Sequence, residues 1–222
     1  MPLVKNAIIA AAGLGSRLGH GKPKCLVEVA GKPILEWQLR LLDDVEDLRI
    51  VVGYMEQDVV RLALSLRPDV VIVRNPAFRS TTTQQSYWLG GRYLKDPCVY
   101  MDGDIIFDPA SFHAFLDRAG EVCPLIGIAA SKTEQAVFAE TLQDGNGDFK
   151  VSAFSRSNKT PWEWANIACL PPGMLQENGG DVFSRLACFT PLNAQSVECF
   201  EFDTDADLVQ AEKFGQKIRS QS

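Results

Sequence analysis

The sequence is poor in the nitrogen and sulfur ligands from which protein metal centres are usually built. It has two histidines, and none of its six cysteines forms a Cys-x-x-Cys pair, so a structural zinc site is not expected. The N-terminus lacks a basic segment followed by an apolar signal core. Scattered cysteines in such a chain are typical of reduced, mostly buried thiols, and we expect a cytoplasmic protein.

The sequence is also short of positive charge and of long apolar runs. Its 22 lysines and arginines face 28 acidic residues, which gives a formal net charge of −6 and argues against a nucleic-acid-binding surface. No apolar run is long enough to span a membrane. A phosphate site must therefore be a local cluster of positive charge. Such a cluster is formed by Arg17, Lys22, Lys24 and Lys32.

What the sequence does contain is an alternation of strand and helix patterns. Residues 4–12 form a nearly continuous apolar run ending in glycines, typical of a strand buried on both faces of a parallel sheet. Further strands are expected at 48–53, 70–73 and 98–101, and helices from Pro33, around the Val59, Ala63 and Leu66 stripe, at 84–94 and from Pro109 behind the cap Asp108. This order predicts a doubly wound sheet with right-handed crossovers.

The second part of the chain has a different pattern. Strands are expected at 125–130 and 164–170, short helices near Met174 and Val182, and a last strand at 197–202 before a final helix. The segments 137–142 and 149–154 flank Asp144-Gly145-Asn146-Gly147, a strong hairpin signal. We therefore predict one Rossmann-like α/β domain over residues 1–222. It has a mostly parallel mixed sheet and a small hairpin-containing lobe, and its halves cover 1–120 and 121–222.

The opening loop admits three ligand-binding interpretations. Gly13 and Gly15 follow a buried strand, where glycines let backbone amides approach a phosphate. A dinucleotide fingerprint needs a third glycine where Leu18 stands, and a P-loop ends in Gly-Lys-Ser/Thr, where this chain has Gly-Lys-Pro. The third interpretation places Arg17 and Lys24 over a triphosphate, and a plain strand-to-helix turn is the structural alternative.

Three longer stretches give this loop a family resemblance. They are Ala-Ala-Ala-Gly-Leu-Gly-Ser-Arg-Leu-Gly at 10–19, Lys-Pro-Lys-Cys-Leu-Val-Glu-Val at 22–29 and Gly-Lys-Pro-Ile-Leu-Glu at 31–36. Together they resemble the opening of the MobA-like nucleotidyltransferase superfamily. Later landmarks of that superfamily match in order at 52–54, 101–104 and 202–204. The resemblance thus covers nearly the whole chain, with little signal at 131–159.

The resemblance implies a nucleoside triphosphate as substrate and a role for each matched residue. Arg17 would contact the β- and γ-phosphates and Lys24 would neutralise charge around the α-phosphate, so these two are the expected catalytic residues. The implied nucleotide-binding residues are Ala11, Ala12, Gly13, Gly15, Ser16, Thr82, Thr83, Ser86 and Asp102. The half 1–120 would bind the nucleotide, and the half 121–222 would bind the acceptor.

The resemblance also implies a Mg²⁺ cofactor held by Asp104 and Asp203. Both are expected at the C-terminal ends of strands, where open α/β sheets bind ligands. Mg²⁺ commonly takes one or two carboxylates together with substrate phosphates. The structural alternatives are a turn acid for Asp104 and a helix cap for Asp203. Thr204 is the better cap, which leaves Asp203 for the metal, with Asp205 as its competitor.

The implied reaction needs no general base. An acceptor phosphate or phosphonate oxygen would attack the α-phosphorus in line, and pyrophosphate would leave. A phosphate monoester has a second pKa near ~6 and is largely a dianion at neutral pH. Positioning and charge neutralisation should therefore supply most of the catalysis.

The segment 75–86 and the short loop before Lys24 favour CTP as the nucleotide. The segment looks like the Thr-Asn-Asn-x-x-Ser segment of phosphocholine and aminoalkylphosphonate cytidylyltransferases, but Thr82 and Thr83 stand where those enzymes have asparagines. Sugar-1-phosphate nucleotidyltransferases usually carry a longer insert in the loop. The hydroxyls and amides of the segment can pair with a base or ribose, and a polar helix start is the equal alternative.

The run Trp162-Glu163-Trp164 is the candidate acceptor site. Aromatic rings beside a carboxylate could hold a cationic head such as choline or an aminoalkyl group, whereas strand tryptophans more commonly pack in a core. The expected acceptor-binding residues are Glu163, Trp164 and Asn166. A sugar-1-phosphate nucleotidyltransferase is the runner-up, and a non-catalytic nucleotide-binding module is the third reading. We allow for a homodimer.

Overall fold

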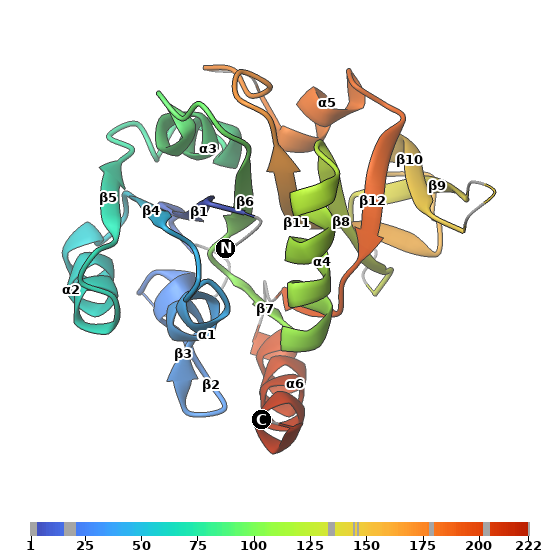
Figure 1. The fold of residues 1–222 in the computed structure, drawn as a ribbon. Helices are drawn as coiled ribbons and strands as arrows, with labels where there is room; N and C mark the ends of the chain where they lie inside the picture. Colours follow the sequence, from blue (N-terminus) through green and yellow to red (C-terminus); the bar gives the residue numbers. More distant parts are fainter. Residues whose placement is uncertain are drawn as a thin grey trace.

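The protein is built around one mixed β-sheet with helices on both faces (Figure 1). A computed structural model describes residues 4–15, 21–132, 136–143, 145, 147–177, 180–201 and 205–221. The strand order is β5-β4-β1-β6-β11-β8-β12-β10-β9. The strands are β1 (Asn6–Ala11), β4 (Asp47–Val52), β5 (Val71–Arg74), β6 (Cys98–Asp102), β8 (Leu125–Ala130), β9 (Phe138–Gln143), β10 (Phe149–Ser155), β11 (Trp162–Leu170) and β12 (Leu192–Ser196).

In the first half of the chain, the parallel part of the sheet consists of β1, β4, β5 and β6. β1 pairs in parallel with β4 and β6, and β4 pairs in parallel with β5. Ala7, Ile8 and Ile9 are fully buried, because β1 is covered on both faces and has strands on either side. The apolar run at the start of the sequence therefore becomes a central strand, as expected.

Helices cover both faces of this sheet (Figure 1). The helices α1 (Ile34–Leu41), α2 (Glu56–Leu66) and α4 (Pro109–Glu121) pack in one apolar core with Ala7 and Ile9. The helices α3 (Thr83–Gly91) and α5 (Val182–Ala187) pack in a second core with Ile8. This two-sided covering is the doubly wound arrangement that the strand–helix alternation predicts.

The second half extends the same sheet with antiparallel strands. β11 runs antiparallel between β6 and β8, and β12 lies parallel to β8. β9 and β10 pair in antiparallel fashion, which confirms the hairpin; of its turn residues, Asp144 and Asn146 lie outside the described residues. The predicted α/β fold class is thus confirmed, with its parallel pairing concentrated in the first half. The boundaries of the domain and of its halves stay predictions.

Several local expectations were wrong in instructive ways. Pro33 precedes α1 as its N-cap instead of opening it, since residues 32–33 pair with 28–29 in the small hairpin β2 (Glu28–Val29) and β3 (Lys32–Pro33). No helix forms near Met174, because the preceding Pro-Pro-Gly makes a turn in which Gly173 adopts φ +79°. Leu66, which was expected on the apolar stripe with Val59 and Ala63, is exposed at the end of α2.

The expected last strand at 197–202 is divided between two partners. Val197 donates its backbone N–H to the Ile128 carbonyl, at the end of β12. The following strand β13 (Cys199–Glu201) leaves the main sheet and pairs with β7 (Ile105–Phe107); Phe202 lies outside the described residues. The final helix α6 (Asp205–Gln221) packs through Ala211 and Ile218 near β2 and β7.

Two further expectations concern thiols and membranes. All six cysteines carry free thiols, and four of them, Cys25, Cys98, Cys169 and Cys199, are buried. In the described part of the chain, none of the helices combines the length and the apolar character needed to cross a membrane. The cap expected for α4 is present, since the Asp108 carboxylate accepts a hydrogen bond of 2.9 Å from Ser111 N.

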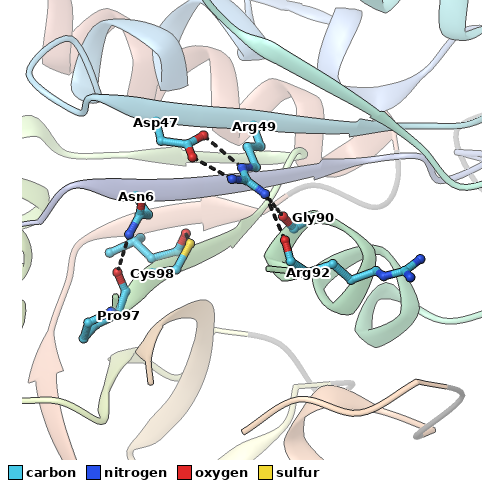
Figure 2. A network of polar contacts seen from close by, with 8 residues as sticks. Asn6, Asp47, Arg49, Gly90, Arg92, Pro97 and Cys98 are labelled. Atoms are coloured by element: carbon cyan, nitrogen blue, oxygen red, sulfur yellow. Dashed lines mark hydrogen bonds and ion pairs between the residues drawn. The ribbon is translucent and has the colours of Figure 1, made fainter. Parts of the chain in front are cut away.

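A network of polar contacts lies near the end of the sheet where β1 and β6 begin (Figure 2). Arg49 makes a two-pronged contact with Asp47, at 2.9 and 2.6 Å. The same guanidinium donates to the carbonyls of Gly90 and Arg92, at 2.9 and 3.2 Å. These carbonyls end α3 and would otherwise lack helical partners. Arg49 therefore ties the C-terminal end of α3 to β4.

We expect Arg49→Met to lower the free energy of unfolding by about 1–3 kcal/mol, because charged hydrogen bonds to half-buried carbonyls are lost while the aliphatic stem is kept. Urea unfolding followed by circular dichroism measures the change. Arg61 is a matched control, since its side chain is 76% exposed and pairs with Asp58 one helical turn away. Arg61→Met should change stability by less than about 0.5 kcal/mol; equal losses in both variants would contradict the role of Arg49.

Candidate active site

A cavity of about 960 Å³ opens at the carboxyl ends of β1 and β6, where open α/β sheets bind ligands. Its size is that of a small-molecule site. The predicted site residues that line it are Ala11, Ala12, Gly13, Gly15, Lys24, Thr82, Thr83, Ser86, Asp102, Asp104, Glu163, Trp164 and Asn166. The predictions Ser16, Arg17 and Asp203 lie outside the described residues, as does the side chain of Asp205. The cavity thus brings together every described residue that the sequence assigned to nucleotide, metal or acceptor.

Lys24 and Asp104 form an ion pair inside this cavity. Lys24 opens a 3-10 turn behind Pro23, and Asp104 follows β6. Their Nζ and Oδ2 atoms are 2.9 Å apart, and the two side chains are only 15% and 20% exposed. The lysine can therefore neutralise negative charge that lies close to the carboxylate.

Gly15 makes room for this lysine. Its φ of +60° is unfavourable for residues with a side chain, and an added Cβ would lie 3.3 Å from Lys24 Cγ. A Cβ on Gly13 would meet no protein atom within 4 Å. Gly15 is thus required by the protein itself, whereas Gly13 borders open space in the cavity.

Asp102 is the inner acid of the same turn. The Tyr87 hydroxyl donates a hydrogen bond of 2.6 Å to Asp102 Oδ1. Burial and, to a smaller extent, the charge of Asp104 raise the pKa of Asp102 to about 7, although the Tyr87 hydrogen bond and Lys24 act in the opposite direction. Tyr87 connects this acid to the opposite wall, because its hydroxyl also lies 3.4 Å from the Asn166 carbonyl.

The hydroxyl-rich segment at the start of α3 forms another wall. Asn75 Nδ2 donates to Thr81 Oγ1 and to Ser86 Oγ, both at 3.1 Å. Thr82 occupies the N-cap position of α3 but its side chain does not cap the helix. Its hydroxyl donates instead to the Gly180 carbonyl, in the loop before α5. The helix-cap alternative is therefore wrong for Thr82, which connects the two halves of the cavity.

β11 supplies the remaining wall through a distortion. Its register with β8 shifts between Trp164 and Ala168, and Asn166 adopts a left-handed φ of 51°. Such bulges re-aim side chains beside functional sites. Asn166 Nδ2 donates to Glu201 Oε2 at 2.8 Å, and Glu163 Oε2 accepts from the backbone N–H of Lys132 at 3.1 Å.

The two tryptophans of this strand belong largely to the core. The Trp162 ring packs edge-on against Phe149, with centroids 5.1 Å apart. Trp164 is buried in the core of α3 and α5 and reaches the cavity with part of its surface. Its indole nitrogen has no hydrogen-bond partner among the residues described. The packing alternative thus accounts for Trp162 and for most of Trp164.

Sequence reasoning missed several residues of the cavity wall. They are Lys132, Arg156, Asp181, Phe183 and Glu201. The Arg156 guanidinium lies 4.9 Å from the centroid of the Phe183 ring. Glu201 directly precedes the landmark at 202–204, which is the one signal that pointed to it. The others come from segments without a recognisable motif.

The chain resembles known proteins in sequence. Residues 7–148 match the family model of the MobA-like NTP transferase domain. A CMP-5'-(3-aminopropyl)phosphonate synthase of Streptomyces rubellomurinus is 35% identical over 134 residues, which are 57% of this chain and 21% of that protein. A choline-phosphate cytidylyltransferase of Haemophilus influenzae is 31% identical over 108 residues, 46% of this chain and 45% of that protein. The chain thus spans less than half the length of either relative.

Solved structures share the fold over nearly the whole chain. The CTP:phosphocholine cytidylyltransferase from Streptococcus pneumoniae has a TM-score of 0.74 at 19% identity, and the match covers 94% of this chain and 98% of that one. A UDP-glucose pyrophosphorylase from Acinetobacter baumanii has a TM-score of 0.77 at 14% identity, with 99% and 100% covered. Because the family model matches well over half of the sequence, and the resemblance at residues 10–36 lies within the matched range, the chain belongs to the MobA-like NTP transferase family.

Proposed function

We propose that the protein is a nucleotidyltransferase that couples CMP from CTP to a small phosphate or phosphonate bearing a cationic group. The observation that carries the proposal is the Lys24–Asp104 pair, 2.9 Å apart at one wall of a cavity whose other wall holds Glu163 and Glu201. Lys24 beside Asp104 suits the negative charge of a triphosphate. The carboxylates of Glu163 and Glu201 suit the positive charge of an ammonium group. Both ends of the reaction are thus matched by charge.

The chain's own residues would act by position and charge. Lys24 would neutralise the α-phosphate while the acceptor oxygen attacks the phosphorus, and pyrophosphate would leave with the bonding electrons. Asp104, together with Asp203, would hold Mg²⁺; carboxylates beside a phosphate site are the donor set that this ion prefers. When bound, the ion would supply charge neutralisation of the phosphates. No described histidine lines the cavity, which agrees with a reaction whose acceptor is already anionic.

The acceptor side supports a cationic substrate. Glu163 and Glu201 lie with the ring of Phe183 on the cavity wall, and carboxylates beside aromatic rings attract ammonium groups. Two relatives are named for CMP-(3-aminopropyl)phosphonate and for choline phosphate. Lys132 and Arg156 on the same wall could balance the acceptor's phosphoryl charge. The fold shared with UDP-glucose pyrophosphorylase keeps a sugar-1-phosphate transferase as the second candidate.

A substrate panel tests the proposal directly. With Mg²⁺ present, pyrophosphate release should be fastest with CTP and either phosphocholine or 2-aminoethylphosphonate. UTP, ATP and GTP serve as nucleotide controls, and hexose-1-phosphates serve as acceptor controls. If a hexose-1-phosphate is turned over and neither amine-bearing acceptor is, the proposal is contradicted and the sugar-phosphate candidate is favoured. Nucleotide binding without any pyrophosphate release would favour a non-catalytic module.

Asp104→Asn should reduce kcat on the order of 10²–10³-fold, because the charge that opposes Lys24 and would hold the metal is lost. The measurement is steady-state pyrophosphate release at saturating CTP and acceptor. Asp108→Asn is the matched control, since Asp108 caps α4 outside the cavity and asparagine also caps helices well. Full Mg²⁺-dependent turnover by Asp104→Asn would remove Asp104 from the mechanism.

Glu163→Gln should raise the acceptor KM about 10-fold for phosphocholine and leave the CTP KM within about two-fold, because the loss of a charge contact worth about 1.4 kcal/mol changes an affinity tenfold. The amide oxygen can still accept the Lys132 N–H, so the local fold is kept. Glu198→Gln is the control, as Glu198 pairs with Lys217 at 2.8 Å on the surface. An equal KM change for propylphosphonate, which has no amine, would contradict ammonium recognition.

A further inference from the structure

Gln38 is a fully buried amide on a helix that otherwise buries apolar side chains. It lies on α1 between Trp37 and Leu39, both buried, and its relative exposure is 0%. Glutamine is rarely found at such a position unless its polar atoms are paired. The position therefore needs an explanation beyond packing.

The amide reaches the turn that carries Asp104. Gln38 Nε2 donates to the Asp102 carbonyl at 2.7 Å and to the Ile105 carbonyl at 2.9 Å. These two carbonyls flank Gly103 and Asp104 on either side. A single NH₂ group thus fixes both ends of a two-residue turn.

The opposite side of the turn is held by β1. Gly103 N donates to the Ala10 carbonyl at 2.9 Å. A Cβ on Gly103 would lie 2.8 Å from the same oxygen, so the turn presses against β1 as closely as a glycine allows. Held between α1 and β1, the turn leaves the Asp104 side chain directed at Lys24.

The Gln38 amide contributes through its nitrogen and not through its oxygen. Gln38 Oε1 is buried and has no hydrogen-bond partner among the described residues. An unpaired buried oxygen is unfavourable, and a methionine or leucine would fill the same space without it. The side chain is therefore retained for its two donated hydrogen bonds.

We propose that Gln38 is a positioning residue that sets the place of Asp104 relative to Lys24 and to the bound triphosphate. The proposal rests on the proposed function for its catalytic consequence. Gln38 does not line the cavity and acts through the backbone carbonyls of Asp102 and Ile105. Its loss should therefore affect the chemical step more than nucleotide binding.

Gln38→Met is the test, since methionine keeps the length and volume. We expect kcat to fall on the order of 10²-fold, because small displacements of a reacting group have effects of this size, while the CTP KM stays within about two-fold. Mn²⁺ binding with CTP and without acceptor, followed by electron paramagnetic resonance, should weaken about 10-fold, as is typical when a group that orients a metal ligand is lost.

A readout independent of turnover is hydrogen exchange at the Gly103 amide in the ligand-free protein. Its exchange should quicken in Gln38→Met because the turn loses its contact with α1. This measurement distinguishes a failure of the proposed function from a failure of the proposal for Gln38. If the parent releases no pyrophosphate, the proposed function fails, and the exchange still reports whether Gln38 holds the turn.

Asn6→Leu is the matched control. Asn6 is also a buried amide, and its Nδ2 donates to the Pro97 carbonyl at 3.1 Å at the far end of β1 (Figure 2). Like Gln38→Met, it removes a buried side-chain donor from a backbone carbonyl, but it should leave kcat, Mn²⁺ binding and Gly103 exchange unchanged. The proposal is overturned if the two variants lose activity equally, or if Gln38→Met keeps the parent kcat and exchange.

Gln38→Asn decides the matter should the methionine variant not fold. The shorter amide keeps its polarity but cannot reach both carbonyls at once. We expect smaller losses of kcat and of Gly103 protection, in the same direction. Parent-like values of both in Gln38→Asn would overturn the proposal.

Discussion

The pairing of Lys24 with Asp104 across the carboxyl ends of β1 and β6 is the constraint around which the cavity is arranged. The two charges are largely removed from water, and the cost of that removal offsets most of their mutual attraction. Such a pair does little for stability, so its position is best explained by what it does for a ligand. Gly15 and Gly103 both serve this arrangement, because each lets the backbone approach where a side chain would obstruct.

The insertion of β11 between β6 and β8 joins the two halves of the site. In a purely parallel sheet, the strand next to β6 would present its carboxyl end at this edge. The antiparallel β11 instead brings Glu163 and Trp164, near its start, to the cavity, and its bulge at Asn166 turns that side chain toward Glu201. Tyr87 spans the junction, with its hydroxyl near both Asp102 and the Asn166 carbonyl. The two walls proposed to bind nucleotide and acceptor are thus connected by hydrogen bonds as well as by the sheet.

Sequence patterns predicted those parts of the fold and site that depend on local rules. The apolar run of β1, the cap at Asp108 and the hairpin of β9 and β10 are each encoded within a few residues. Lys24 and Asp104 are 80 residues apart in sequence, yet Asp104 could be placed at a strand end, and the family resemblance placed Lys24 at the phosphates of the same ligand. The described candidate site residues, predicted from motifs far apart in the sequence, line one cavity.

What sequence patterns could not predict depends on tertiary pairing. Gln38 stands among other polar residues of α1, Glu36 and Arg40, so the pattern did not single it out, and its partners lie 64 and 67 residues away. β12 alternates buried Leu192 and Ala194 with more exposed Asn193, a pattern too short to separate from a loop. Thr82 lies where a helix cap belongs, and only the loop at Gly180 shows that its hydroxyl is used elsewhere.

The division of the site also explains why family membership does not determine the acceptor. The family match ends at residue 148, whereas Glu163, Asn166 and Glu201 all lie beyond it. The wall proposed to bind the nucleotide is built from the matched half, whose backbone geometry around Gly15 and Gly103 leaves little room for a side chain. The proposed acceptor wall is built from side chains on β11 and β13. On the proposed function, acceptor specificity is set by side chains beyond the family match, and the triphosphate is bound by residues within it.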